Sequence, residues 1–374
     1  MPMPPLRLSI GTILHFTALL MISASFFGCA AFRAPIQPET TRTDQERNLD
    51  MVLNTAGKNR PELEKFLDIY QPQSARAKQA RFLVANLPPA DRVAMTAQDL
   101  RKIVDYAHLA RKTLPWGPNI PENIFRYYVL PHRVAQEPFQ PCRAHFYKEL
   151  APLVSNATAR EAVIRVNRWC RRKTAFKTTA RWDQGPLTTI KRGIGRCEEA
   201  VILCVLAMRS VGIPARPAGT PAWQHTDDNH VWAEVWLNGK WHALEAAQPY
   251  SELTGNRLKA SVLRSIVYGS LDRDNSRVIR KSFGATMINR TPDYVPTWKL
   301  NARVLDAEGE PLSGQKIFVS VFNYACFRPV AALKTDSQGQ ASISLGQGSF
   351  LLTVSHGGDD DYALISNLEP EKND

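Results

Sequence analysis

The chain has 374 residues, 44% of them hydrophobic, and carries 47 Lys and Arg against 35 Asp and Glu, for a net charge of +12. This length and composition exclude a disordered or fibrous protein and allow two or three compact domains. The positive charge suits contact with anionic lipids, cell-wall polymers or nucleic acid, or simply a solvated basic surface. Because no arginine-rich run is interleaved with aromatic residues, we expect no nucleic-acid partner.

Residues 1–29 have the layout of a secretory signal peptide: a basic residue, an apolar run short for a membrane span, and small residues around Cys29. The stretch FFGCA resembles a bacterial lipobox, in which Cys29 is lipidated and becomes the new N-terminus, although Phe26 stands where Leu is usual. The alternative is an ordinary signal peptide or an uncleaved anchor with a buried Cys29. We expect a lipid-anchored envelope protein, and Ala30 resembles a residue that sorts to the outer membrane of a Gram-negative bacterium.

A polar, proline-bearing segment at residues 30–48 predicts a tether, and residues 49–115 predict a helical region. Within this region, Thr96 and Asp99 have the spacing of a capping box and precede an apolar face. The same design recurs at Thr158 and Glu161.

Cys197 follows a glycine-bearing turn and precedes an apolar run that Gly212 and Pro214 would end. The thiol is therefore predicted at the N-terminus of a buried helix, where unpaired amides and the helix dipole favour an anionic thiolate. Gly193 and Gly195 leave space for a substrate backbone, and the Cys197 amide is a candidate donor to an oxyanion. The alternative is a buried structural cysteine, which suits Cys204 better.

A thiolate nucleophile needs a base, and residues 230–245 supply one on a predicted β-hairpin. Asn238-Gly239 is a strong signal for a two-residue turn, which pairs Leu237 with Lys240. In that register His230 and Glu245 share one face of the sheet, diagonally placed, so the carboxylate can hold the imidazole. A three-residue loop would reverse the side-chain parity and remove this arrangement.

Other polar residues near this hairpin are weaker candidates. His225 lies in a loop and His242 faces the other side of the hairpin. Asp227 and Asp228 are candidates for binding a cation or a basic substrate. The alternative is that they belong to a solvated loop. Glu198 and Glu199 are most simply explained by their position in the first helical turn, where the helix dipole favours acidic side chains. Upstream, Trp182 or Gln184 is a candidate second oxyanion donor, with Trp182 alternatively an aromatic wall.

Residues 296–370 show short alternating runs separated by turn residues, which predict a small β-sandwich. This part resembles the carboxypeptidase-regulatory or Cna-B-like modules of secreted bacterial proteins, which space or bind and do no chemistry. Cysteine spacing matches neither a zinc site nor a dense disulfide framework, so we expect no metal and no cofactor. An oxidising compartment permits a bridge among four cysteines: Cys142, Cys170, Cys204 and Cys326.

Three blocks, GRCEEAVILCVLAMRSVGIPAR, NHVWAEVWLNGKW and ALEAA, resemble the transglutaminase-like superfamily in order and spacing. The resemblance implies a papain-like α+β core at residues 116–290, with a helix-borne cysteine against an antiparallel sheet. By position, it assigns Cys197 as nucleophile, His230 as base and Glu245 as orienting acid. The superfamily usually has Asp followed by Pro where this chain has Glu245 and Ala246.

The whole chain is thus expected to be an α+β protein with an N-terminal helical region and a C-terminal β-sandwich. Its expected function is that of an envelope cysteine enzyme that forms a thioacyl intermediate on a peptide or protein amide. Because the loop TPAWQHTDDN is short and gives little means of excluding water, we expect hydrolysis rather than cross-linking. The alternatives are a cross-linking acyl transferase and a catalytically idle module that binds peptide or glycan.

Overall fold

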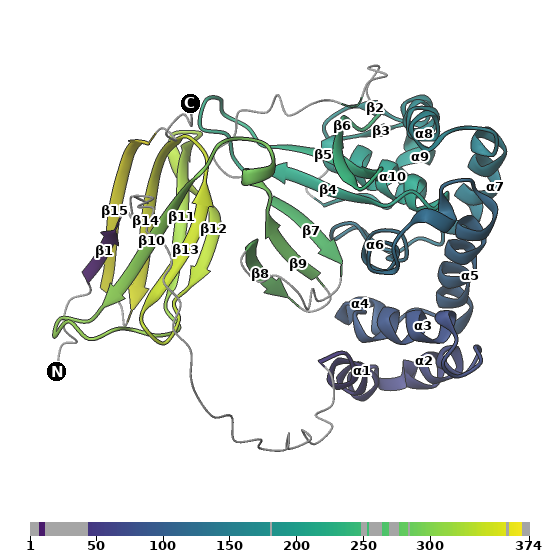
Figure 1. Cartoon of the computed structure of the whole chain (residues 1–374), viewed down its shortest axis with the longest axis horizontal. Helices are drawn as coiled ribbons and strands as arrows, with labels where there is room; N and C mark the ends of the chain where they lie inside the picture. The colour runs from purple at the N-terminus through teal and green to yellow at the C-terminus, as the bar shows by residue number, and fades with distance from the viewer. Residues whose placement is uncertain are drawn as a thin grey trace, which may run out of the picture.

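The computed structural model describes residues 7–11, 44–179, 182–247, 253, 264–268, 277–282, 285–356 and 359–368. Cys29, most of the predicted signal peptide and most of the predicted tether lie outside the described residues. In the described part, helices lie at one end, a six-stranded sheet in the middle and a group of longer strands at the other end (Figure 1). This combination of helices and mostly antiparallel strands confirms the α+β class.

Helices make up the first half of the described chain, and their caps follow the sequence signals. Thr96 and Asp99 form a capping box at the start of α5, and Thr158 and Glu161 form one at the start of α8. Each box satisfies backbone amides that the helix itself leaves unpaired. The helices are α1 (Asp44–Thr55), α2 (Arg60–Leu67), α3 (Ala75–Ala85), α4 (Pro89–Arg92), α5 (Ala97–Thr113), α6 (Glu122–Tyr128), α7 (Arg143–Val154), α8 (Ala159–Lys173), α9 (Pro186–Arg192) and α10 (Cys197–Ser210).

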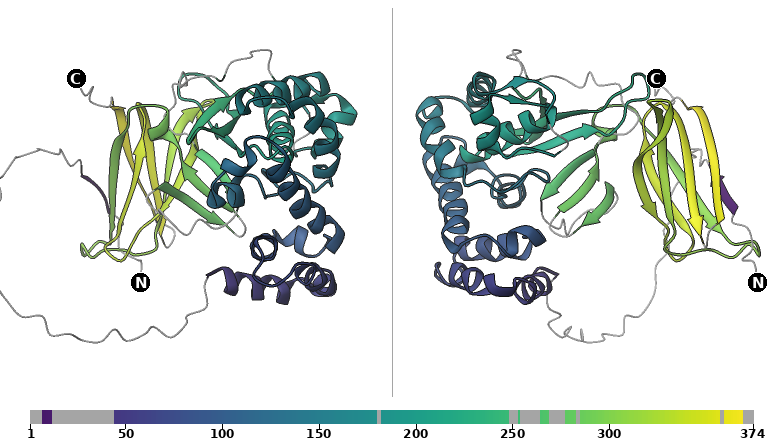
Figure 2. Two further views of the ribbon diagram at one scale, coloured as in Figure 1. Left: turned by 45° about the vertical axis from the view of Figure 1, so that its right-hand side comes forward. Right: turned by 180° about the vertical axis from the view of Figure 1, so that it is seen from behind.

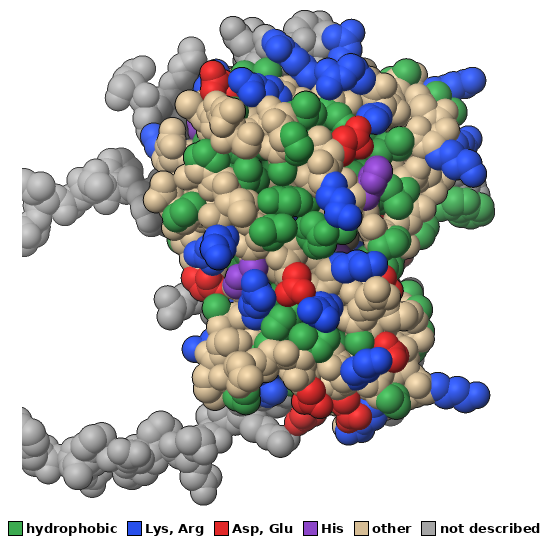
Figure 3. Space-filling view, turned by 90° about the vertical axis from the view of Figure 1, so that its right-hand side faces the viewer, with side chains coloured by type: hydrophobic (Ala, Val, Ile, Leu, Met, Phe, Trp, Pro, Cys, Tyr) green, Lys and Arg blue, Asp and Glu red, His purple; other side chains and the backbone are tan. Residues whose placement is uncertain are grey.

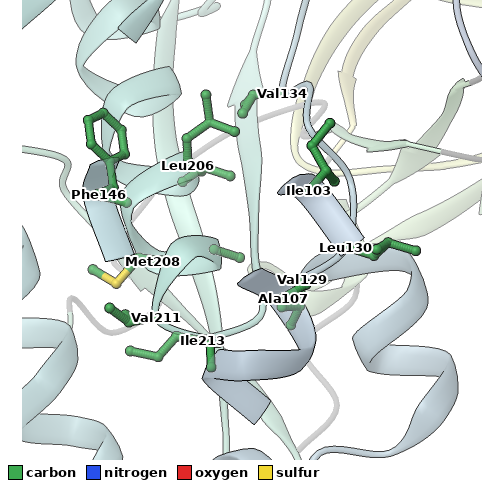
Figure 4. Close-up of a cluster of buried hydrophobic side chains, with 14 of the residues drawn as sticks. Ile103, Ala107, Val129, Leu130, Val134, Phe146, Leu206, Met208, Val211 and Ile213 are labelled. Atoms are coloured by element: carbon green, nitrogen blue, oxygen red, sulfur yellow. The ribbon is translucent and has the colours of Figure 1, made fainter. Parts of the chain in front are cut away.

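Helix α10 is the centre of the main hydrophobic core. It packs against α7 and α8 on one side and against β4 and β5 on the other, and every residue from Val201 to Ser210 is buried. Burying each large apolar side chain stabilises the fold by roughly 1.5–3 kcal/mol. The position of its first turn is therefore set by the surrounding core. Figure 4 shows side chains around its second half: Ile103, Ala107, Val129, Leu130, Val134, Phe146, Leu206, Met208, Val211 and Ile213.

The six-stranded sheet carries the predicted hairpin. Strand order is β6-β5-β4-β7-β9-β8, and all paired neighbours are antiparallel. Leu237 pairs with Lys240, so the predicted two-residue turn and register are confirmed. Asn238 and Gly239 have φ of 49° and 83°, as such turns require. The strands are β4 (Ala215–Thr220), β5 (His230–Leu237), β6 (Lys240–Leu244), β7 (Arg264–Tyr268), β8 (Val278–Ser282) and β9 (Ala285–Asn289).

Residues 298–356 and 359–368, here named the β module, form two antiparallel sheets around a second hydrophobic core, together with β1. One sheet has the order β1-β10-β13 and the other β12-β11-β14-β15. The edge strand β1 (Arg7–Gly11) comes from the predicted signal peptide and pairs with β10. Figure 2 shows the β module at the far end of the molecule from the helices. Its strands are β10 (Trp298–Leu305), β11 (Lys316–Asn323), β12 (Cys326–Lys334), β13 (Gln340–Leu345), β14 (Gly348–His356) and β15 (Asp359–Leu368).

Two surface properties bear on the expected location and partners. Within the part of the chain that the structure describes, no helix combines the length and apolar character needed to cross a membrane. On the face formed by the helices, Lys and Arg side chains are scattered among neutral and apolar ones rather than gathered into one stripe (Figure 3).

Candidate active site

Cys197 is the first residue of α10, as the sequence predicts. The preceding helix α9 ends at Arg192 and is capped by Gly193, whose φ of 68° lies in the left-handed region that glycine adopts without strain. A short strand, β3 (Ile194–Gly195), then pairs with β2 (Ala175–Phe176) and leads into the helix. As the first residue of a helix, Cys197 has one of the backbone amides that lack an intrahelical acceptor. This amide is available to a negatively charged oxygen near the thiol.

The two carboxylates after Cys197 have different environments. Glu199 is fully buried and accepts hydrogen bonds from the Arg196 amide at 2.6 Å and from the Thr179 hydroxyl at 2.8 Å. Burial by itself would raise the pKa of Glu199, but these donors and the Arg196 guanidinium outweigh it and hold the pKa below its ordinary value. Glu199 thus caps α10. Glu198 is partly exposed and accepts a hydrogen bond from the Cys197 thiol, with Sγ and Oε2 3.2 Å apart.

His230, the first residue of β5, connects Cys197 with Glu245. Its Nε2 lies 3.1 Å from Oε2 and 3.3 Å from Oε1 of Glu245, which directly follows β6. The hydrogen bond with Cys197, followed by that with Glu245, raises the pKa of His230 to about 10. Burial opposes this shift and is outweighed. Because Nε2 faces the carboxylate, Nδ1 is the ring nitrogen that Glu245 does not engage.

These three side chains line one cleft of about 1050 Å³. The exposed fractions of the His230 and Glu245 side chains are 32% and 25%, so solvent reaches the imidazole and the carboxylate. The cleft has walls from four parts of the chain: residues 171–178 around β2, the start of α10, residues 228–231 and 245–247 of the sheet, and Tyr324 of the β module. A cleft of this kind suits an extended chain with a few polar anchors.

Asn167 is a site residue that the sequence reasoning did not single out. It lies on α8 and is 3% exposed. Its Nδ2 donates to the Glu245 carbonyl at 3.0 Å, and its Oδ1 accepts from the Ala247 amide at 2.8 Å. Asn167 therefore holds the backbone on both sides of the Glu245 side chain. The available signal was a polar residue on the apolar face of an amphipathic helix, beside Val163, Val166 and Cys170.

A second missed feature is the buried network under His230. The Trp232 ring lies 5.9 Å from the His230 ring, and its Nε1 donates to the Tyr294 hydroxyl at 2.9 Å. Tyr294 donates in turn to Glu234 at 2.6 Å, and Glu234 also accepts from Arg216 at 2.5 Å. Burial by itself would raise the pKa of Glu234, but Arg216 and Arg290 lead the interactions that hold it below the ordinary value. The network fixes Trp232, which packs beside the imidazole.

The weaker candidates have other contacts. Gln184 is buried, and its side chain donates to the Ile194 carbonyl and accepts from Arg192, so it has a structural role. Trp182 is 75% exposed. Asp227 accepts a hydrogen bond from the Tyr324 amide, and the Asp228 side chain accepts from the next backbone amide. The His225 ring lies 5.1 Å from the Trp223 ring at a tilt, and His242 on β6 pairs with Val235 on β5.

The described cysteines are all free thiols: Cys142, Cys170, Cys197, Cys204 and Cys326. Cys170 and Cys204 contact each other in the core, where burial first and the neighbouring thiol second raise the pKa of Cys170. Among the residues whose placement is given, no three His, Cys, Asp or Glu side chains are grouped so as to hold a metal ion.

Comparison with known proteins finds a family match for the central part of the chain. Residues 148–246, which contain Cys197, His230 and Glu245, match the transglutaminase-like superfamily. No curated protein matches the chain. Two solved structures are similar to it: a proposed cysteine protease from Cytophaga hutchinsonii (15% identity, TM-score 0.25, 40% of this chain and 57% of that chain) and red sea bream transglutaminase (11% identity, TM-score 0.24, 71% and 58%). The chain spans less than two thirds of either. The superfamily match supports cysteine acyl-transfer chemistry.

Proposed function

We propose that the chain is a cell-envelope cysteine enzyme that forms a thioacyl intermediate on a peptide or protein amide and hydrolyses it. The observation that carries this proposal is the position of His230, which hydrogen-bonds to Glu245 and lines the same open cleft as the Cys197 thiol. A nucleophile, a base and a group that orients the base are the parts that covalent acyl transfer needs.

In the acylation step, the Cys197 thiolate attacks the carbonyl carbon of the amide. The carbonyl oxygen becomes negatively charged, and the Cys197 backbone amide is placed to donate to it. The protonated His230 then gives its proton to the leaving nitrogen, the C–N bond breaks, and the amine departs. Glu245 accepts from Nε2 of the imidazole and so keeps the ring oriented towards the thiol.

In the second step, the thioester is attacked either by water or by another amine. Hydrolysis is favoured by the exposure of the His230 and Glu245 side chains, because water has direct access to the base that must take its proton. His230 removes a proton from the water, the C–S bond breaks, and the thiolate is restored. The cross-linking acyl transferase and the idle binding module remain as outcomes of the test below.

The test is to incubate the full-length protein with a peptide library, with and without a labelled primary amine, and to identify products by mass spectrometry. The matched control is Cys197→Ala. We expect Cys197-dependent cleavage products that do not contain the amine. Dominant incorporation of the amine would show transfer instead of hydrolysis. A complete lack of Cys197-dependent products would indicate the idle binding module.

The envelope location is a separate part of the proposal and depends on Cys29. Lipidation of this thiol would place the mature protein in the membrane fraction, in the outer membrane of a Gram-negative host. Cys29→Ser should release the protein from that fraction, with Cys326→Ser as a control that leaves the signal segment intact. A wild-type protein that is fully soluble and carries no lipid would contradict this location.

A further inference from the structure

The turn between β11 and β12 brings a side chain of the β module into the cleft. Tyr324 lines the cleft from more than 75 positions past residue 246, where the matched superfamily region ends. In Figure 1 the loop between β4 and β5 reaches the end of the β module where this turn lies. The turn and the catalytic candidates therefore share one cleft although they belong to different layers of the molecule.

This turn has an unusual composition for its backbone conformation. Asn323 pairs with Cys326, so the loop has two residues, Tyr324 and Ala325. Both have positive φ, 51° and 55°, a region that glycine, asparagine and aspartate adopt at lower energy than a tyrosine does. Closing the hairpin thus gives no reason for a tyrosine at this position. Residues held in such conformations tend to cluster at binding sites.

The loop between β4 and β5 holds this turn in place through hydrogen bonds. Asn323 is 2% exposed, and its Nδ2 lies 2.9 Å from the Trp223 carbonyl and 3.1 Å from the Thr226 and Asp228 carbonyls. The Tyr324 amide donates to Asp227 at 2.5 Å. The loop that these bonds fix runs directly into His230, so the distance between Tyr324 and the imidazole is set by the same contacts.

A second contact fastens the same loop. The Gln224 side chain donates to the Ser349 carbonyl and accepts from the Ser349 amide at 3.2 Å. The chain approaches so closely here that a Cβ on Gly348 would overlap Gln224. With two anchor points, the β module is held in a defined orientation against the loop.

The ring of Tyr324 remains open to a ligand. The residue is 51% exposed, and the guanidinium of Arg328 lies over the ring at 4.9 Å, which limits its rotation. Phe176, on β2, is 74% exposed and lines the same cleft. Two exposed aromatic side chains on segments far apart in sequence therefore lie along the cleft that contains Cys197. Exposed aromatic rings in a cleft favour the binding of apolar or aromatic groups.

We propose that Tyr324 is a specificity-determining residue that binds a bulky apolar or aromatic side chain of the peptide near the amide attacked by Cys197. The β module is then part of the substrate site and more than a spacer. This inference rests on the proposed function, because it takes the occupant of the cleft to be a peptide chain. It adds the class of peptide: one with a large apolar side chain close to the reacting amide.

Binding is measured on the full chain with Cys197→Ala, so that the result does not depend on turnover. The probes are N-acetylated hexapeptide amides that vary among Phe, Tyr, Leu, Ala and Asp on either side of the central amide. We expect tighter binding of the Phe, Tyr and Leu peptides. Tyr324→Ala should raise the Kd of the Phe, Tyr and Leu peptides about tenfold, because the ring contact is lost. The Kd of the Ala and Asp peptides should not change. Tyr324→Phe should retain the preference.

The matched control is Tyr362→Ala, which removes a 72% exposed tyrosine from β15 of the same module. This control variant should bind every peptide of the set with unchanged affinity. The inference is overturned if Tyr324→Ala keeps the preference for large apolar residues, or if no peptide of the set binds.

Turnover by the chain with Cys197 intact separates this inference from the proposed reaction. Tyr324-dependent binding without any Cys197-dependent product would support the inference and contradict the reaction. Cys197-dependent turnover that is indifferent to Tyr324 would support the reaction and contradict the inference.

Discussion

The Nε2 atom of His230 lies 3.1 Å from Oε2 of Glu245 although the two residues are separated by a whole β-hairpin. His230 begins β5 and Glu245 follows β6, so the pair depends on the two-residue turn at Asn238-Gly239. The carboxylate thus holds the Nε2 side of the imidazole inside the cleft that Cys197 also lines.

Cys197 should be the most reactive of the described buried or half-buried thiols. It lies at the start of α10 in an open cleft, whereas Cys204 lies in the middle of the same helix with no exposed surface. Iodoacetamide near neutral pH should therefore alkylate Cys197 at least tenfold faster than Cys204, as followed by peptide mass spectrometry. Equal and slow alkylation of both thiols in the folded protein would indicate that Cys197 is structural.

The raised pKa of His230 predicts a specific pH dependence. The folded protein binds the imidazole proton more tightly than the unfolded chain, with a pKa of about 10 against 6.5. Stability from this group is therefore fully present below about pH 6.5 and is lost as the pH rises towards 10. Glu245→Gln should lower the pKa of His230, which NMR titration of the imidazole would detect. An unchanged titration would show that the carboxylate does not act on the ring.

Replacing Glu245 should impair turnover while the protein remains folded. Glu245→Gln keeps the size of the side chain but removes the charge that orients and stabilises the imidazolium, so kcat should fall roughly a hundredfold to ten-thousandfold. The comparison variant is Asp228→Asn, whose side chain accepts a hydrogen bond from the neighbouring Asn229 amide; its effect should be much smaller. If the two effects were reversed, the assignment of the acid would be wrong.

Asn167 is expected to act as a positioning residue. In Asn167→Ala the Glu245 carbonyl and the Ala247 amide lose their partner, which should lower the free energy of unfolding by about 1–3 kcal/mol in urea titrations. Because Glu245 is then less well placed, the pKa of His230 should also fall, an effect that a purely structural residue would not have. Arg168→Ala, on the exposed face of the same helix, controls for changes in α8 and should leave both quantities unchanged.

The sequence by itself determined the features that depend on neighbouring residues. Gly193 and the apolar run after Cys197 predict where α10 begins, and Gly212 predicts where it ends. Asn238-Gly239 predicts the hairpin register and hence that His230 and Glu245 share a face. These predictions hold because caps and two-residue turns are decided by the backbone preferences of a few adjacent residues.

Only the tertiary structure decided which distant residues complete the cleft. Asn167 bonds to Glu245 across 78 positions, and Asn323 bonds to Trp223 across 100 positions. Asn167 is visible in the sequence only as a polar residue on an apolar helix face, and no local pattern identifies the partner of either residue. Asp227 shows the same limit: its charge suggests a cation or a solvated loop, whereas its carboxylate holds the turn that carries Tyr324. Such contacts arise when separately formed layers pack together, and hydrophobic periodicity specifies which face is buried but not which residue lies opposite.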